Sequence, residues 1–240
     1  METQVTEIAR DTFRISTFHP QFGIQFNQFL IHDEQPLLIH TGFQNMLDDT
    51  LSGISEVMDP AQLRWIGFSH FEADECGALN ALLGLAPNAQ AVCSQVAAMV
   101  NLSDFACREA RGLDDGEILN TGRHQIRFLA CPHVPHGWDA GLFFDETAKT
   151  LFCSDLFFHG GDPEPLTRDD ISTRAEVAMR EGLLGPLAHD MPFTPYTVAT
   201  LQRLANLEPR TLATMHGSSF QGDGKQAILA LASVVTNLLS

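Results

Sequence analysis

Basic residues are scarce in this sequence, and their scarcity argues against several kinds of partner. Lys and Arg total 14 of 240 residues against 30 Asp and Glu, which gives a formal net charge of −16 at pH 7. Nucleic acids and anionic membrane surfaces are bound through clustered Lys and Arg side chains, so we expect neither as a partner. Small molecules, metal ions and basic proteins fit the charge balance better.

The chain also lacks long apolar runs and paired cysteines. No run approaches the ~20 apolar residues of a membrane span, and no start segment resembles a signal peptide, so we expect a cytoplasmic protein. The five cysteines are an odd number and include no Cys-x-x-Cys pair. This pattern argues against a disulfide framework and a thiolate zinc site, and it predicts reduced thiols.

Length and hydrophobic content favour one domain over residues 1–240. With 44% hydrophobic residues the chain can bury a sizeable core, and no repeat or Pro-, Gly- or Ser-rich linker divides it. Apolar segments bounded by turn residues predict strands at 11–20, 24–33, 35–42, 63–70, 89–94, 123–131, 141–146 and 150–158. Helical patterns lie at 46–58, 76–84, 95–102, 168–184, 194–207 and 225–239. The order predicts a mixed α/β chain.

An acidic motif follows one of the strand patterns. In "FSHFEADECGALN", residues 68–80, His70, Glu72 and Asp74 alternate at every second position. An extended backbone would point all three side chains the same way. Converging carboxylates repel one another and lose hydration unless water separates them or a cation neutralises them. The motif therefore indicates either a metal site or a solvated acidic loop that heads a helix starting near Gly77.

Three more residues of metal-ligand type follow apolar strands or turns. They are His136 in "CPHVPHGWDAG", Asp155 in "LFCSDLFF" and His216 in "TLATMHGSS". The order of HxExD, a His in a Pro- and Gly-containing loop, an Asp after a strand and a late His before Gly resembles the metallo-β-lactamase fold over essentially the whole chain. The resemblance implies an α/β fold, a four-layer αββα sandwich.

The middle position of the motif distinguishes two branches of that fold. Ordinary hydrolases carry HxHxDH, whereas Glu72 makes the motif HxExD, which marks the diiron branch. That branch includes the flavodiiron oxygen and nitric oxide reductases and the shorter oxygen-binding diiron proteins (ODP), which lack a flavodoxin domain. The chain ends at Ser240, soon after the last ligand-type residue, and so resembles the shorter kind, with no flavin in this chain.

The resemblance implies a site for two iron ions. In it one iron is held by His70, Glu72 and His136, the other by Asp74 and His216, and both are bridged by Asp155. Three carboxylates supply one more negative charge than the hydrolase motif, which has His in place of Glu72. Anionic oxygen donors favour a hard, highly charged ion, so the set favours iron, although manganese or zinc can occupy it.

Three further residues are candidates for supporting roles or additional ligands. His133 shares a loop with His136, but the segment from His136 to Asp155 matches the flavodiiron pattern without a gap, whereas a start at His133 needs a three-residue insertion. Glu75 stands where many relatives have His, and it can ligate the second metal, hydrogen-bond a bound water or cap the following helix. His159 can donate to a ligand carboxylate or have no role at the metal.

Phenylalanine is abundant, with 17 residues against a single tyrosine. Phe71, Phe143, Phe157 and Phe158 lie near the proposed ligands in the sequence. They are typical of an apolar core, and they would equally suit a dry pocket for oxygen.

The diiron resemblance implies a protein that binds and reductively activates oxygen or nitric oxide. It would act as an oxygen sensor with a signalling partner, or as a reductase with an external electron donor, and the family makes a homodimer plausible. The alternative is a hydrolase of esters, thioesters or lactones, in which the metals lower the pKa of a bridging water. A third interpretation is an oxygenase for an organic substrate, although such enzymes usually carry a large extra domain.

Overall fold

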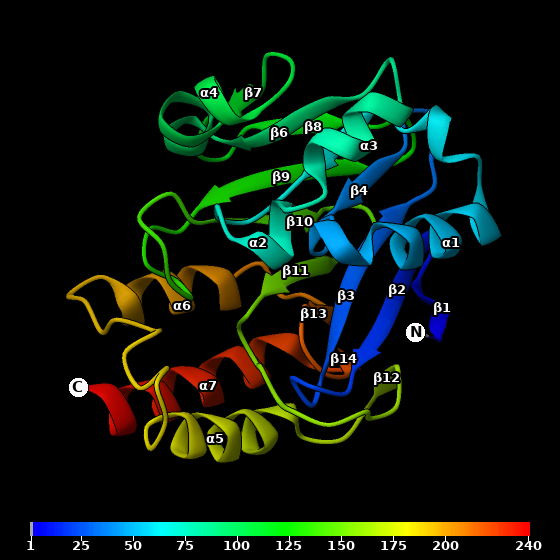
Figure 1. The fold of residues 1–240 in the computed structure, drawn as a ribbon. Coiled ribbons are helices and arrows are strands. Elements are labelled where there is room, and N and C mark those ends of the chain that lie inside the picture. The colour runs from blue at the N-terminus through cyan, green and yellow to red at the C-terminus, as the bar shows by residue number, and fades with distance from the viewer. Residues whose placement is uncertain (1) are drawn as a thin grey trace.

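Two seven-stranded sheets, packed face to face, form the centre of the computed structural model, which describes residues 2–240 (Figure 1). In sheet order, the first sheet consists of β1 (Thr3–Ala9), β2 (Thr12–His19), β3 (Ile24–Ile31), β4 (Leu37–Ile39), β5 (Trp65–Gly67), β6 (Gln90–Ser94) and β7 (Arg111–Leu113). The second consists of β12 (Leu166–Thr167), β14 (Ser219–Gln221), β13 (Thr211–Thr214), β11 (Thr150–Ser154), β10 (Gly141–Asp145), β9 (Gln125–Ala130) and β8 (Ile118–Asn120).

Helices cover the outer face of each sheet. The helices beside the first sheet are α1 (Leu47–Val57), α2 (Ala73–Cys76), α3 (Leu79–Leu85) and the short α4 (Ser103–Phe105). The helices beside the second sheet are α5 (Ile171–Gly182), α6 (Thr197–Ala205) and α7 (Gly224–Leu239). The predicted α/β fold with a four-layer αββα sandwich is confirmed.

Side chains of the central strands point alternately to the two faces of each sheet, which produces three apolar layers: one between the sheets and one between each sheet and its helices. In β10, Phe143 packs between the two sheets, whereas Leu142 and Phe144 pack against the helices of the second sheet. In β3, Phe29 lies between the sheets and Leu30 packs beneath α1 and α3. Successive strand residues point to opposite faces, and here both faces are buried. This explains the uninterrupted apolar runs of the sequence.

Several elements differ from the sequence prediction. The edge strand β1 was not expected, because its segment "TQVTEIA" is mostly polar and partly exposed. β7, β8 and β12 are two or three residues long, too short to show a strand period. The strand expected at 150–158 ends at Ser154, where a positive φ of 51° turns the chain. The helix expected at 95–102 forms a π-helical turn at Ala97–Leu102.

The loops after β5, β9, β11 and β13 meet at one edge of the sandwich. β11 and β13 are parallel neighbours, so the loops at their carboxyl ends lie side by side. β4, β5 and β6 are also parallel, and the motif of residues 68–80 follows β5. These loops carry the ligand-type residues of the sequence, so the topology places them together.

The structure also bears on the state of the cysteines and on membrane-spanning helices. All five cysteines are free thiols, and only Cys107 is exposed. Over residues 2–240, no helix has both the length and the apolar composition needed to cross a membrane.

Candidate metal centre

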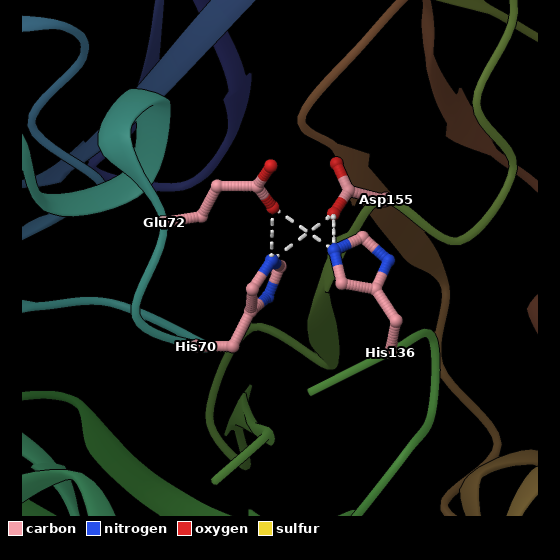
Figure 2. A group of neighbouring side chains, drawn as sticks. All are labelled: His70, Glu72, His136 and Asp155. Atoms are coloured by element: carbon pink, nitrogen blue, oxygen red, sulfur yellow. Dashed lines mark hydrogen bonds and ion pairs between the residues drawn. The ribbon is translucent and has the colours of Figure 1, made fainter. Parts of the chain in front are cut away.

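Four side chains from three loops converge on one point at this edge. His70, Glu72, His136 and Asp155 each offer one ligand atom, and these atoms lie within 4.8 Å of one another (Figure 2). Oε2 of Glu72 lies 2.8 Å from Nε2 of His70 and 3.0 Å from Nε2 of His136. Oδ2 of Asp155 lies 3.6 Å and 3.7 Å from the same two nitrogens. Two imidazoles and two carboxylates form a donor set that suits iron, zinc or manganese.

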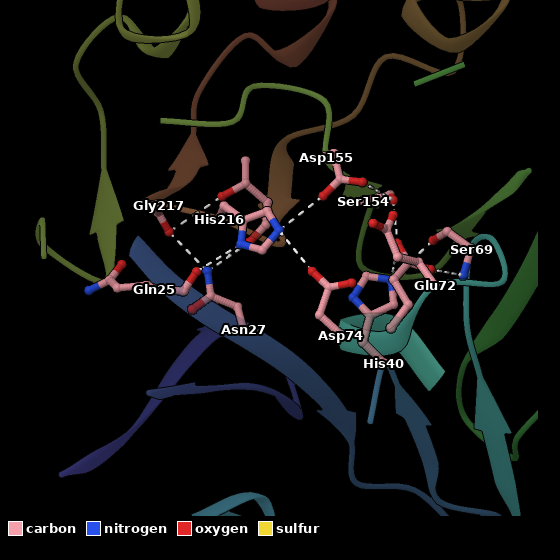
Figure 3. Close-up of polar contacts among 12 residues, drawn as sticks. Gln25, Asn27, His40, Ser69, Glu72, Asp74, Ser154, Asp155, His216 and Gly217 are labelled. Atoms are coloured by element: carbon pink, nitrogen blue, oxygen red, sulfur yellow. Dashed lines mark hydrogen bonds and ion pairs between the residues drawn. The ribbon is translucent and has the colours of Figure 1, made fainter. Parts of the chain in front are cut away.

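The other oxygen of Asp155 faces a second group of donors. Nε2 of His216 lies 3.1 Å from Oδ1 of Asp155 and 3.4 Å from Oδ2 of Asp74 (Figure 3). Asp155 thus presents one oxygen to each half of the site, as a carboxylate that bridges two ions does. The structure therefore brings together all six residues of the ligand set that the sequence resemblance implies, and their chemistry fits two metal ions.

The local backbone separates the three residues of the HxExD motif. Glu72 is extended, with φ −138° and ψ 156°, but α2 begins at Ala73 and places Asp74 in its first turn. The expectation that one extended segment points all three side chains the same way is wrong for Asp74. The helix expected to start near Gly77 is α3, which begins at Leu79, and the short helix α2 before it was not expected. The helical turn directs Asp74 to the half of the site that contains His216.

The loop after β9 contributes His136. Its ring packs edge-on against His70, with ring centroids 4.3 Å apart. His133 is not part of the cluster among the described residues: its backbone N–H donates to the carbonyl of Gly137 at 2.7 Å, and its φ of 64° lies in the left-handed region. A cis Val134–Pro135 peptide separates the two histidines.

Known proteins resemble this chain over most of its length. The model of the ODP family, described as "ODP family beta lactamase", matches residues 24–217. The chain belongs to the ODP family. The predicted resemblance to the diiron branch of the metallo-β-lactamase fold is thereby confirmed.

This ODP-family chain is similar in sequence to several named proteins and in fold to solved structures. Sequence relatives include putative diflavin flavoprotein A 1 of Nostoc sp. (27% identity over 92% of this chain), nitric oxide reductase of Moorella thermoacetica (25% over 92%) and rubredoxin-oxygen oxidoreductase of Megalodesulfovibrio gigas (25% over 83%). The chain spans 40%, 55% and 50% of their respective lengths. The structure of a fragment of putative diflavin flavoprotein A 5 from Nostoc sp. superposes with a TM-score of 0.81 at 19% identity, over 99% of this chain and 96% of that one.

Glu75 contacts the backbone and side chains around the ODP-family site. Its buried carboxylate accepts hydrogen bonds from the backbone N–H groups of Ser69 (2.7 Å) and His70 (2.8 Å) and from the Ser154 hydroxyl (2.5 Å). Oε1 also lies 3.3 Å from Nδ1 of His70. A carboxylate at Nδ1 keeps the proton on that nitrogen and leaves Nε2 free to bind a metal. These contacts agree with the supporting role that was one of the sequence expectations for Glu75, because its carboxylate orients His70.

The carbonyl of Gln25 orients the second histidine. Nδ1–H of His216 donates to this carbonyl at 2.9 Å, so Nε2 faces Asp155 and Asp74. The next residue, Gly217, has a φ of 98°, and a Cβ there would lie 2.4 Å from Nε2 of His159. Only glycine fits this turn, which explains the "HG" pair in the sequence.

His159 does not reach a ligand carboxylate. Its Nδ1–H donates to the Phe157 carbonyl at 2.9 Å, and its Nε2 accepts from the backbone N–H of Ser218 at 2.9 Å. Burial lowers the pKa of His159, in keeping with a neutral ring that both hydrogen bonds require. The residue fixes the loop that carries His216.

Sequence reasoning missed His40 and the part played by Asp139. The fully buried His40 ring places Nε2 3.0 Å from the Ser69 hydroxyl (Figure 3). The same Nε2 lies 3.4 Å from Oε1 of Glu75. Asp139 accepts hydrogen bonds from the backbone N–H of Phe71 (3.0 Å) and the side chain of Asn101 (3.1 Å). Both residues lie beside strand ends. This position in the sequence could have marked them as site residues, as it did for the proposed ligands.

The metal-free site binds protons strongly. Burial opposes charging of His70, but Glu75, Glu72 and Asp155 outweigh it and raise the pKa of His70 to about 10. Burial also opposes charging of His216, and Asp155 and Asp74 raise its pKa to about 10. Hydrogen bonds from His136 and His70 lower the pKa of Glu72 to about 2. Without metal, protonated His70 and His216 therefore offset part of the carboxylate charge at neutral pH.

Metal affinity is expected to rise steeply with pH, because a metal must displace these protons. With His70 and His216 both protonated and each facing a different ion, the apparent affinity for each Zn²⁺ should increase about tenfold per pH unit from about pH 6 to 8, and the product of the two binding constants about a hundredfold. Competition titrations against a chromophoric chelator at several pH values measure this slope. A slope near zero would show that neither histidine is protonated in the metal-free protein.

The same shifts set the pH dependence of metal-free stability. Because both pKa values are raised on folding, the histidines stabilise the fold fully below their ordinary pKa of about 6.5, and this stabilisation is lost as the pH rises through about 10. We expect the metal-free protein to unfold at lower urea concentration at pH 9 than at pH 7, and the zinc-loaded protein to change less.

Asparagine substitutions should separate the two histidines of the β9 loop. His136→Asn removes a donor and should weaken zinc binding by more than about a hundredfold, whereas His133→Asn should change it by less than about threefold. Asn is the matched choice because it tolerates the positive φ of position 133. Equilibrium dialysis with zinc measures both. A larger loss from His133→Asn would mean that the loop rearranges around the metal.

Proposed function

We propose that this chain is a non-haem diiron protein that binds and reduces oxygen or nitric oxide, with electrons from a separate donor. The observation that carries the proposal is the division of Asp155 between two donor groups, with Glu72 in the position that makes the set rich in anionic oxygen. The names of two relatives, nitric oxide reductase and rubredoxin-oxygen oxidoreductase, agree with this chemistry.

The residues divide into two sets of ligands and a bridge. His70, Glu72 and His136 would hold one ion, Asp74 and His216 the other, and Asp155 both. Iron, when bound, would supply the redox chemistry that the side chains lack. Manganese and zinc can occupy the same donors, because all three metals accept imidazole and carboxylate ligands.

The remaining residues prepare this site for a small, weakly polar gas. Glu75 and the Gln25 carbonyl fix the imidazoles of His70 and His216 with Nε2 toward the site. Phe26 and Phe158 pack edge-on against His216, at centroid distances of 5.1 and 5.4 Å, and limit the access of water to that half. Fixed donors in a partly dry site keep the ligand geometry constant while the charge at the centre changes.

Anaerobic reconstitution with Fe²⁺ tests the proposal. We expect about two iron ions per chain, oxygen or nitric oxide consumption by the reduced protein, and an optical spectrum that changes on exposure to the gas. A zinc-loaded sample is the control and should consume neither gas. Efficient hydrolysis of esters or lactones by the zinc form, with an inert iron form, would overturn the proposal in favour of a hydrolase.

The same experiment separates a reductase from a sensor. With an excess of a one-electron reductant, continued gas consumption identifies a reductase. A single uptake followed by a long-lived spectral change identifies a sensor that reports the gas to a partner.

A further inference from the structure

A cavity of about 560 Å³ extends from the metal centre toward α5 and α7. Its inner end is formed by side chains of the proposed ligand set: Glu72, Asp74, His136, Asp155 and His216. Pockets that bind drug-sized organic ligands have volumes of roughly 300 to 1,000 Å³. Oxygen and nitric oxide are diatomic, so the cavity is much larger than either gas requires.

One wall of this cavity is aromatic. Phe26 packs against His216, Phe43 packs against Phe26 at a centroid distance of 5.1 Å, and Phe22 stacks on Phe43 at 5.9 Å with an interplanar angle of 19°. Phe158 contacts His216 as well. Phe22 is 58% exposed. The phenylalanines form an apolar path from solvent to the metal centre, and flat ring systems pack well on such a surface.

One face of α5 forms another part of the wall, and small residues on it leave the space open. Ala175, Ala178, Met179 and Gly182 line the cavity, and their spacing of three, four and seven residues places them on the same side of the helix. Larger side chains at the alanine positions would project into the volume. The outward side of the same helix carries Val177, which is 52% exposed and does not line the cavity.

The charges around the cavity restrict its ligand. Among the described residues that line it there is no Lys or Arg, and the acidic groups are Asp190 and the carboxylates at the metal centre. Phosphate and sulfate groups are normally bound through Arg, Lys or clustered N–H donors. Without these, the lining favours an uncharged molecule with a hydrocarbon body.

We propose that this cavity binds a neutral aromatic organic molecule, with an oxygen function directed to the metal centre. The inference rests on the proposed function and extends it, because the same site would then hold an organic compound beside the gas. The aromatic wall receives the ring system, and the face of α5 with Ala178 limits its width.

Titration with 2-naphthol, a neutral aromatic alcohol, tests the cavity. The zinc-loaded protein is used, because zinc keeps the site filled without redox chemistry. We expect saturable binding of one molecule with a Kd below about 100 µM, measured by calorimetry and by naphthol fluorescence. Ala178→Phe should raise the Kd at least about tenfold by filling the cavity, and Val177→Phe, the same change on the outward face, should alter it less than about twofold.

Folding of each variant is checked by its circular dichroism and its bound zinc. If Ala178→Phe fails to fold, Ala178→Leu replaces it and should weaken binding in the same direction. Absence of saturable binding up to about 1 mM naphthol, or equal weakening by the variants at 177 and 178, would overturn the proposal. Naphthol binding by a protein whose iron form ignores both gases would refute only the proposed function. Gas consumption without naphthol binding would refute only the cavity assignment.

Discussion

Asp155→Ala is expected to remove both metal ions from the protein rather than one. Oδ2 of Asp155 faces the His70 and His136 pair, and Oδ1 lies 3.1 Å from His216, so the substitution takes a donor from each half of the site. It also removes a carboxylate that offsets the charge of two ions held close together. The apparent affinity for both should fall by more than about a hundredfold.

Metal content per chain after dialysis measures this outcome, with Asp74→Ala as the matched comparison. Asp74 contacts only His216 among the proposed ligands, so its loss should lower occupancy of one ion first. Asp169→Ala, at an exposed carboxylate on the segment before α5, controls for removal of a negative charge and should retain both ions. Retention of one tightly bound ion by Asp155→Ala would rule out the bridging role.

Glu75→Ala should have the largest effect on stability. The substitution leaves two backbone N–H groups and the Ser154 hydroxyl without their acceptor inside the protein, and it removes the carboxylate beside His40 and His70. Breaking a buried ionic hydrogen-bond network in this way costs about 3–5 kcal/mol. We expect the free energy of unfolding of the metal-free protein to fall by that amount in urea titrations at neutral pH.

Two further variants distinguish the structural and metal-directed roles of Glu75. Glu75→Gln keeps the shape but removes the charge, so it should cost less stability than Ala and still weaken zinc binding by about ten- to a hundredfold through the orientation of His70. Glu56→Ala, on the exposed side of α1, is the control and should change neither property. If Glu75→Gln bound zinc as tightly as the unmodified protein, the contact with Nδ1 of His70 would have no effect on the metal.

The two effects follow from one feature of the site. Carboxylates and histidines are packed together in a region where Glu75 and His40 are fully buried and Asp155 is largely so. Removing a single member leaves the others with uncompensated charge or unmet hydrogen bonds. Such a network is rigid when complete, which suits a centre that would hold metal ions in a fixed geometry.

Much of the fold could be predicted from sequence patterns that are local. The runs "GLFFD" and "TLFCS" each have three successive apolar side chains at their centre, as a strand buried on both faces requires. α5, α6 and α7 show clear helical periodicity. The ligand types could also be predicted, since HxExD lies within five residues and the other candidates follow strands or turns. Short or polar strands such as β1 and β8 show no apolar pattern in the sequence. They are stabilised by pairing with neighbouring strands, which their own composition does not reveal.

The sequence by itself determined the mixed α/β class and the kinds of side chain available to hold a metal, because both depend on periodicity and spacing along short segments. The layered arrangement was implied by the family resemblance. The tertiary structure alone decided that Glu75 contacts Nδ1 of His70, that Asp155 faces two groups of donors, and that α5 and Phe22 line one cavity. These features depend on contacts between segments far apart in the chain. Their geometry is set by how the two sheets and their helices pack, and no local pattern encodes it.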